Sequence, residues 1–285
     1  MPMTQIKINT EKCKKCGTCV QICPMAVFEL KDRNSTTEVL RADLCISCGQ
    51  CVSLCLQSAI DHSFFPTEKI IPVITESLPS YEQIIELIRS RRSVRAYRDK
   101  PVEKEIITKI IDGAYLAPSA SNYQSTEFKV VQDKEMLNKI SGITNDFVTM
   151  VMGIFQAKEN KEPLSESEKH ALNSMDWIAQ KQVEGRDMYL FNTPALVFFH
   201  SVTDISFPEA SVNLMVQNAL IISHSLGLGG FYAGGVVACC QNDPRIPELL
   251  GIPQTNKIYG AITIGYPKFK YKNWINRRTP KIEWN

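Results

Sequence analysis

Eight of the ten cysteines in this 285-residue chain fall into two copies of one spacing. They are Cys13, Cys16, Cys19, Cys23, Cys45, Cys48, Cys51 and Cys55. Each run has the pattern C-x2-C-x2-C-x3-C, and the second run repeats the first at an offset of 32 residues. Three thiolates separated by two residues can wrap one corner of an iron–sulfur cube, while intervening backbone N–H groups bond to its sulfurs. The spacing therefore predicts two [4Fe–4S] clusters.

Two other uses of these cysteines fit the pattern less well. Zinc also binds four thiolates, but zinc sites usually draw on separated C-x2–4-C pairs and not on triplets followed by a fourth cysteine. Structural disulfides are rare in the reducing cytoplasm. We expect a cytoplasmic protein because residues 1 to 16 lack the apolar segment of a secretory signal. Iron–sulfur ligation is therefore favoured over both.

Residues 3 to 62 resemble bacterial two-cluster ferredoxins, in which the fourth cysteine of each run ligates the other cluster. The resemblance implies one cluster held by Cys13, Cys16, Cys19 and Cys55, and a second held by Cys45, Cys48, Cys51 and Cys23. Gly17 and Gly49 occupy the same place in both runs, where a residue without Cβ lets the loop approach a cluster. Residues 27 to 40 predict a β-hairpin. We expect a ferredoxin-like domain over residues 1 to 62.

Residues 63 to 79 predict a linker to a second domain. They contain three prolines and no clean periodicity, which is typical of an extended connection. The pattern changes at Ser80, which forms a capping box with Gln83 and precedes an apolar stripe. A helix over residues 81 to 90 should open the second domain, which we expect to run from residue 80 to residue 285.

The predicted helix leads into a dense basic segment that contains Arg91, Arg92, Ser93 and Arg95. Arginine forks match phosphate oxygens, and a cation beside the pyrimidine edge of a flavin stabilises its anionic reduced ring. A solvated basic helix end explains the same residues. On this segment alone, both interpretations stay open.

Together with three later segments, the basic segment resembles the FMN-dependent nitroreductase family over residues 80 to 285. The resemblance implies that Arg91 and Ser93 lie near the ribityl phosphate and Arg95 near the ring, with Arg92 in the same motif. A second segment is similar to the P-S-x-x-N-x-Q loop, which in that family meets the flavin from the partner subunit. Its residues are Pro118, Ser119, Ala120, Ser121, Asn122 and Gln124. The family usually has proline where this chain has Ser125.

The third and fourth segments follow in the same order as in the family. The glycine pair resembling Gly234 and Gly235 brings backbone N–H groups to the flavin N5 and O4. In isolation, this glycine-rich stretch also reads as a helix C-cap at Gly227 and a turn. Arg277 and Arg278 resemble the final phosphate contact, and the sequence does not distinguish which of the two makes it. Four segments in this order predict one bound FMN.

The expected secondary structure indicates an α+β protein, with a small ferredoxin-like domain followed by an α/β sandwich around one sheet. We expect strands over residues 126–131, 195–200 and 258–264, and helices over residues 103–116 and 210–226. The last of these helices is apolar nearly all round and should be buried, and the family resemblance makes it a homodimer-interface helix. Residues 145 to 189 predict a helical stretch that is either a lid over the substrate or an ordinary surface excursion.

The predicted function is an FMN-dependent oxidoreductase that receives electrons through its clusters and reduces a small organic acceptor, such as a nitroaromatic, a quinone or an enone. The expected donor is a low-potential electron-transfer protein or NAD(P)H. One alternative is an NAD(P)H-dependent flavin reductase that passes electrons out through the clusters. Another is a non-enzymatic electron carrier or redox sensor. No side chain identifies itself as a general acid, and we expect Cys239, Cys240 and the four histidines to be structural.

The composition argues against two classes of partner. The 32 Lys and Arg residues against 30 Asp and Glu residues leave a formal charge of +2, which gives no electrostatic reason for nucleic-acid binding. The apolar stretches fall short of the roughly 20 residues that a membrane-spanning helix needs. We therefore expect neither a nucleic-acid nor a membrane partner.

Overall fold

The computed structural model describes residues 4–32 and 34–285 and divides the chain into two compact units. The first unit comprises Met1–Leu78 together with Ser121–Tyr123. The second comprises Pro79–Ala120 and Gln124–Asn285. The domain limits at residues 62 and 80 stay predictions.

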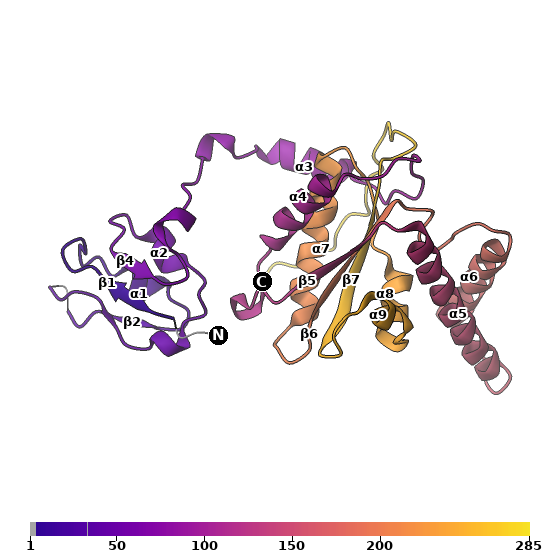
Figure 1. The fold of residues 1–285 in the computed structure, drawn as a ribbon, viewed down its shortest axis with the longest axis horizontal. Coiled ribbons are helices and arrows are strands. Elements are labelled where there is room, and N and C mark those ends of the chain that lie inside the picture. Colours follow the sequence, from indigo (N-terminus) through magenta and orange to yellow (C-terminus); the bar gives the residue numbers. More distant parts are fainter. Residues whose placement is uncertain (1–3, 33) are drawn as a thin grey trace. The chain divides into compact units, whose positions relative to one another are not determined.

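The first unit contains the same strand and helix arrangement twice. Its elements are β1 (Ile6–Ile8), α1 (Thr18–Ile22), β2 (Phe28–Glu29), β3 (Glu38–Val39), α2 (Gln50–Leu54) and β4 (Ile60–His62). β1 pairs with β4 and β2 pairs with β3, both antiparallel (Figure 1). The second pair is the hairpin predicted over residues 27 to 40. The duplicated cysteine pattern therefore corresponds to a duplicated backbone.

Gly17 and Gly49 immediately precede α1 and α2 in a left-handed conformation, with φ of 70° and 73°. Glycine adopts this conformation without the strain that a Cβ introduces. A Cβ on Gly49 would also lie 3.2 Å from the ring of Phe65. Backbone conformation explains both glycines, and their close approach to a cluster stays a prediction.

The residues that follow the first unit's sheets contain two short 3-10 helices, η2 (Thr67–Lys69) and η3 (Thr75–Ser77). The sequence had predicted only an extended chain here. The helix α3 (Tyr81–Ser90) begins where the capping box predicts, because the Ser80 hydroxyl accepts from the Gln83 N–H at 3.3 Å and the Gln83 side chain accepts from the Ser80 N–H at 2.8 Å.

The second unit is built on a three-stranded antiparallel sheet in the order β5-β6-β7 (Figure 1). The strands are β5 (Glu127–Val131), β6 (Ala195–Val202) and β7 (Asn256–Ile264). The central strand β6 is buried on both faces. Val197 and Phe199 belong to one apolar core, whereas Leu196 and Phe198 belong to the other. This alternation makes the unit a sandwich with helices on both faces of one sheet.

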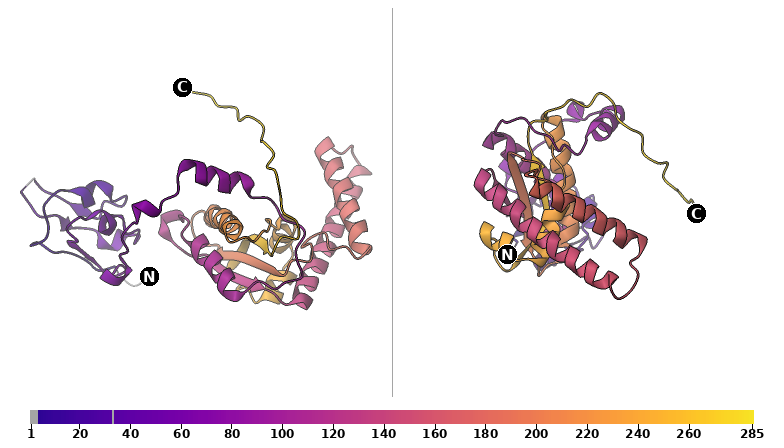
Figure 2. Two further views of the ribbon diagram at one scale, coloured as in Figure 1. Left: turned by 90° about the horizontal axis from the view of Figure 1, so that it is seen from above. Right: turned by 90° about the vertical axis from the view of Figure 1, so that its right-hand side faces the viewer.

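One core lies against α4 (Lys104–Tyr115) and α7 (Pro208–Ser225). The other lies against α5 (Lys134–Glu159), α8 (Gly234–Asn242) and α9 (Arg245–Leu250). The predicted helical stretch 145–189 consists of the end of α5 and α6 (Glu166–Val183), which pack together and project beyond the sheet (Figures 1 and 2). Within the described residues, no helix is long and apolar enough to cross a membrane.

The helix α7 is buried on one face only, which corrects the prediction of burial all round. Val212, Met215 and Ala219 are fully buried, but Leu214 on the outer face is 48% exposed. Gly227 follows the helix with φ of 76°, as expected of a left-handed residue just beyond a helix end.

Candidate cofactor sites

The repeated cysteines line two cavities in the first unit. One cavity, of about 220 Å³, is lined by Cys13, Cys16, Cys19, Cys51 and Cys55. The other is lined by Cys23, Cys45, Cys48 and Cys51. Each cavity brings together all four cysteines of one predicted ligand set, so that Cys55 and Cys23 each lie with cysteines of the opposite run. In the part of the chain that the structure describes, no group of three His, Cys, Asp or Glu side chains is placed to hold a single metal ion.

The surroundings of the cysteines suit thiolate ligands. Backbone N–H groups of Val27, Ser47 and Ala59 donate to the Sγ atoms of Cys23, Cys45 and Cys55 at 3.3 to 3.4 Å. Such bonds stabilise negative sulfur. Burial raises the pKa of the Cys51 thiol to about 11, so a positively charged iron centre is what would keep this sulfur deprotonated at neutral pH. The donor set therefore fits iron–sulfur clusters.

His62 is a residue near the second cavity that sequence reasoning left without a role. Its Nε2 atom lies 3.5 Å from the Sγ atom of Cys45, and the residue is only 5% exposed. Burial lowers the pKa of the imidazole. A comparison of the two repeats could have identified it, because the position 32 residues earlier holds Leu30.

Three of the arginines predicted to contact FMN, namely Arg91, Arg92 and Arg277, lie within electrostatic reach of one another in the second unit. Burial lowers the pKa of Arg91, and the positive charges of Arg277 and Arg92 lower it further. None of the three forms an ion pair within residues 4–32 and 34–285. Clustered like charges repel one another, and a dianionic phosphate would relieve that repulsion while accepting guanidinium hydrogen bonds. Arg278 is not among the charges that act on Arg91.

Backbone pairing places the basic segment beside the glycine-rich segment. Ser93 pairs with Gly230, and the Val94 N–H donates to the Gly230 carbonyl at 3.2 Å. Gly229 pairs in turn with Gly265 at the end of β7. A Cβ on Gly230 would lie 1.7 Å from a backbone oxygen of the sheet, so only glycine fits there. These first glycines position the segment, a role the sequence reading did not assign to them.

The predicted flavin-ring contacts follow in the same region. The Arg95 guanidinium lies 5.1 Å from the ring centroid of Phe231. Gly234 and Gly235 lie in the first turn of α8, where the Gly234 N–H donates to the Tyr232 carbonyl at 2.9 Å. The N–H groups that follow it in this turn lack intrahelical partners and suit an electron-rich ligand edge. A Cβ on Gly235 would meet only a Tyr189 ring carbon, at 3.9 Å. Protein packing alone thus does not require glycine at this position, which leaves room for a flat ligand.

The P-S-x-x-N-x-Q loop, residues 118–124, makes a separate set of contacts from the arginine and glycine segments. Its Ser119 hydroxyl accepts from the Gln124 N–H at 3.1 Å, and the Ala120 N–H donates to the Ser211 hydroxyl at 3.1 Å. Pro118 is exposed, and Ser121 has a positive φ of 45°. Asn122 belongs to the first unit, where its amide nitrogen donates to the Ser47 carbonyl at 2.7 Å.

Within the second unit, the loop and the arginine group lie at opposite ends of α7. Ser211, which bonds the loop, is in the first turn of α7, and His224 is in its last turn. His224 bonds the Ser90 hydroxyl at 2.8 Å, next to Arg91. The α-helix rises about 20 Å over the thirteen steps from residue 211 to residue 224. One chain therefore gathers the arginines and glycines but not the loop.

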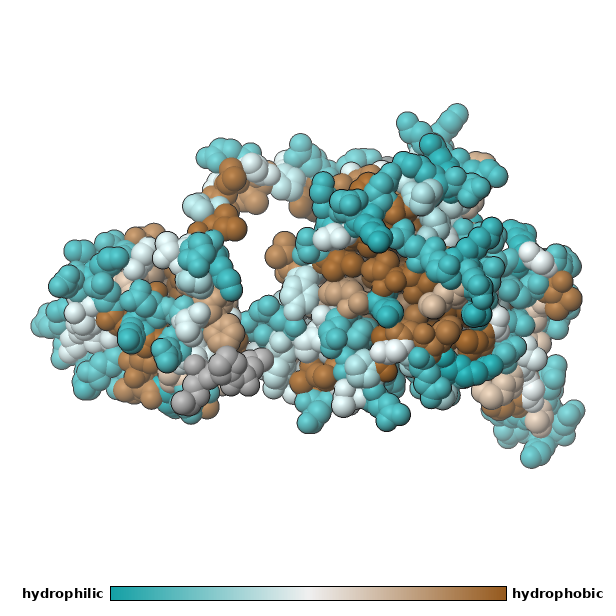
Figure 3. Space-filling model, in the orientation of Figure 1, coloured by the Kyte–Doolittle hydropathy of each residue, from teal (hydrophilic) through white to brown (hydrophobic). Residues whose placement is uncertain are grey.

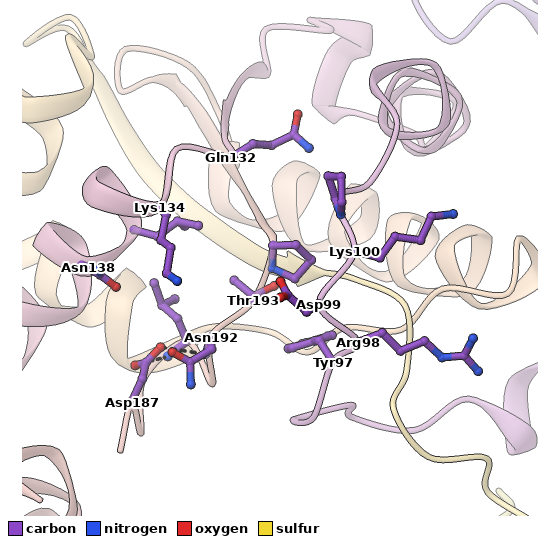
Figure 4. Close-up of a pocket in the computed structure, with 14 residues that line it drawn as sticks. Tyr97, Arg98, Asp99, Lys100, Gln132, Lys134, Asn138, Asp187, Asn192 and Thr193 are labelled. Atoms are coloured by element: carbon purple, nitrogen blue, oxygen red, sulfur yellow. Dashed lines mark hydrogen bonds between the residues drawn. The ribbon is translucent and has the colours of Figure 1, made fainter. Parts of the chain in front are cut away.

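A separate cavity of about 440 Å³ lies between residues 97–101 and residues 187–194 (Figure 4). None of the predicted flavin residues lines it. Asp187, labelled in Figure 4, accepts hydrogen bonds from the Asn192 N–H at 2.9 Å and the Ser141 hydroxyl at 2.8 Å. This carboxylate stabilises the chain reversal before β6. The cavity and the predicted flavin contacts are therefore distinct places in the second unit.

Burial also explains the two cysteines outside the repeats. Cys239 and Cys240 are buried residues of α8, and burial raises the pKa of the Cys239 thiol to about 11. They are neutral packing residues, as the sequence predicted.

Comparison with known proteins identifies relatives of both units. The sequence model described as the nitroreductase family matches residues 88–266, and that described as a 4Fe-4S dicluster domain matches residues 12–60. A Cr(VI) reductase from Pseudomonas sp. (strain G-1) is 29% identical over 199 residues, which are 68% of this chain and 70% of the relative. An NADPH-flavin oxidoreductase from Vibrio harveyi is 26% identical over 183 residues, which are 64% of this chain and 65% of the relative.

Solved structures share the fold of the second unit. A crystal structure of oxidized iodotyrosine deiodinase bound to FMN and 3-iodo-L-tyrosine aligns with a TM-score of 0.54 and 21% sequence identity. The alignment covers 71% of this chain and 98% of that one. Together with the first unit, this likeness confirms the predicted α+β fold class.

Proposed function

The chain belongs to the nitroreductase family and is an oxidoreductase, and on that premise we propose that it binds FMN and receives electrons for it through two [4Fe–4S] clusters. The observation that carries the proposal is that each of two cavities is lined by all four cysteines of one crossed ligand set, with Cys51 lining both cavities. A single cluster or a zinc ribbon does not require the fourth cysteine of one run to join the first three of the other run. The domains we propose are residues 1 to 62, a linker over 63 to 79, and residues 80 to 285.

The second unit supplies the flavin contacts in this proposal. Arg91, Arg92 and Arg277 bind the phosphate, because they form a cationic cluster without a carboxylate partner among the described residues. Arg95 lies beside the ring, and the N–H groups that follow Gly234 in the first turn of α8 donate to the ring's polar edge. When bound, FMN supplies two-electron chemistry and the clusters supply one-electron transfer.

We propose a homodimer in which the loop around Ser119 reaches the flavin contacts of the other copy. The 20 Å separation along α7 supports this, because a single chain leaves the loop far from Arg91. The outer face of α7 exposes Leu214 and Leu226, and hydrophobic residues are visible on the surface of the second unit (Figure 3). A second copy packed on α7 would bury these side chains and complete two sites at once.

The acceptor we propose is a small organic molecule of the nitroaromatic, quinone or enone type. Relatives are named for chromate, flavin and iodotyrosine chemistry, so family membership does not select one acceptor. The acceptor is therefore identified by which organic molecule reoxidises the flavin.

A second candidate is an NADPH-dependent reductase that exports electrons through the clusters. The Vibrio harveyi relative, named an NADPH-flavin oxidoreductase, favours it. In this version the same arginines and glycines hold the flavin, and the first unit docks an electron acceptor. Only the direction of electron flow differs.

Two measurements on anaerobically purified protein test these proposals. Analysis should find about eight iron, eight sulfide and one FMN per chain, whereas about two zinc without sulfide would overturn the cluster assignment. Stopped-flow reduction with reduced ferredoxin, and separately with NADPH, then identifies the donor. A nitroaromatic chase should reoxidise the flavin. A flavin that no organic acceptor reoxidises would leave only an electron carrier or sensor.

A further inference from the structure

The two halves of the first unit differ in what surrounds their cysteines. At the second cavity, the Nε2 atom of His62 lies 3.5 Å from the Sγ atom of Cys45, within hydrogen-bonding distance for sulfur. The equivalent position of the first half, 32 residues earlier, is Leu30, which has no polar atom in its side chain. The first half instead places the Thr18 hydroxyl 3.3 Å from the Cys16 sulfur. A duplicated backbone thus carries unequal donors.

The tautomer of His62 follows from its second ring nitrogen. The backbone N–H of Phe64 donates to Nδ1 at 3.2 Å, so Nδ1 is an acceptor and carries no proton. In a neutral imidazole the proton must then be on Nε2, the atom that faces Cys45. Among residues 4–32 and 34–285, His62 forms no ion pair, and its ring packs against the rings of Phe64 and Phe65. The imidazole is therefore held as a donor aimed at one sulfur.

We propose that His62 donates a hydrogen bond from Nε2 to the Cys45 thiolate and thereby raises the reduction potential of the second cluster above the value it would otherwise have. The inference rests on the proposed function, in which Cys45 ligates that cluster. Reduction adds one negative charge to a cluster and its thiolates, so a donor bond to a ligating sulfur stabilises the reduced state more than the oxidised state. His62 acts through Cys45 and is a positioning residue.

Burial makes the bond effective. His62 is almost fully shielded from solvent, and a hydrogen bond is stronger in such surroundings than in water. Its ring centroid lies 4.8 Å from that of Phe65, which also packs against Gly49 beside Cys48. The imidazole, the aromatic ring and the cluster-binding loop form one packed group. The two clusters are therefore chemically distinguishable although their ligand spacing is the same.

The test uses full-length protein with His62→Leu, which copies Leu30 of the first half, and His62→Gln, which retains an amide donor. Potentiometric titration followed by electron paramagnetic resonance gives the midpoint potential of each cluster. The signal of a Cys48→Ala protein, which keeps only the first cluster, assigns the two potentials. For His62→Leu we expect the one-electron reduction constant of the second cluster to fall about tenfold, which is 59 mV, with the first unchanged. His62→Gln should shift it less.

Unchanged potentials in a His62→Leu protein with full iron content would overturn the inference, as would equal shifts of both clusters. If His62→Leu loses iron, His62→Phe preserves ring volume without a donor and the same comparison applies to it. A wild-type protein that lacks eight iron contradicts the proposed function itself. Eight iron with potentials insensitive to position 62 contradicts only the role of His62.

Discussion

The two units of the chain assemble their sites in different ways. In the first unit, the cysteines of both predicted ligand sets come from a short stretch between Cys13 and Cys55, and two small repeats bring them together. In the second unit, Arg91 and Arg277 stand at opposite ends of the sequence and meet only because a sheet and its flanking helices are folded. The loop around Ser119 stays apart from them. Local spacing thus defines one site, whereas packing and, in the proposed homodimer, a second copy define the other.

The largest expected effect is the loss of a whole cluster when one thiolate is removed. Cys48→Ala should lower the iron content from about eight to about four per chain, since a cube with three protein ligands is readily lost. Cys239→Ala is the matched control, because this cysteine is buried in the second unit, lines neither cavity and should leave the iron content unchanged. Iron analysis and the visible cluster absorption measure both.

Double variants test the crossing of the ligand sets. Cys13→Ala with Cys55→Ala should retain about four iron, because both cysteines serve the same cluster. Cys45→Ala with Cys55→Ala should retain almost none, because each removes a different cluster. The opposite result would assign the fourth cysteine of each run to its own cluster.

The next largest effect is expected on FMN affinity, when one arginine of the group is removed. Arg91→Ala removes a partly buried guanidinium from the phosphate site, and a lost charge-assisted hydrogen bond should weaken FMN binding about 10- to 100-fold. Arg186→Ala, at an exposed position, is the matched control. Fluorescence titration of deflavinated protein with FMN measures both affinities. Equal affinities for Arg91→Ala and wild type would place the phosphate elsewhere, and the cluster content should be the same in all three proteins.

Glycine substitutions should have a smaller effect, on the free energy of unfolding. This effect should distinguish a glycine that packing requires from one that it does not require. Gly230→Ala should lower the free energy of unfolding of the second unit by about 1–3 kcal/mol, because its Cβ meets the backbone of β7. Gly142→Ala should raise it by about 0.5–1 kcal/mol, because this glycine lies within α5 with no atom within 4 Å of an added Cβ. Denaturant titration followed by flavin release measures both. A stabilising Gly230→Ala would contradict the close strand pairing.

Regular elements with strong local signals were predicted well from the sequence. The capping box at Ser80 and Gln83 gave the start of α3, and apolar runs gave the three strands of the sheet to within two residues. The cysteines that line each cavity could be anticipated from their short spacing and from the ferredoxin resemblance, and their ligation of clusters stays a prediction. In each case neighbouring residues determine the feature.

Features that depend on tertiary packing were not accessible. His62 shows no metal-ligand spacing, and its role emerges only when β4 places it beside Cys45. The sequence suggested that Gly230 is part of a turn. The structure shows that glycine is needed there because a Cβ would collide with a backbone oxygen of β7. The apolar residues around α7 predicted that the whole helix is buried. Within one chain, its outer face is exposed. These outcomes are set by contacts between segments far apart in the sequence.

The central claim is that each cluster is complete within one chain whereas each flavin site is shared by two. The most direct test mixes two variants, Arg91→Ala and Gln124→Glu, after reversible dissociation of the dimers. About half of the dimers formed from an equal mixture are mixed, and each mixed dimer contains one site with both changes and one with neither. FMN binding by the mixture should therefore return to about a quarter of the wild-type amount, while iron stays at about eight per chain. No recovery of FMN binding on mixing would show that each chain builds its own flavin site and would contradict the account.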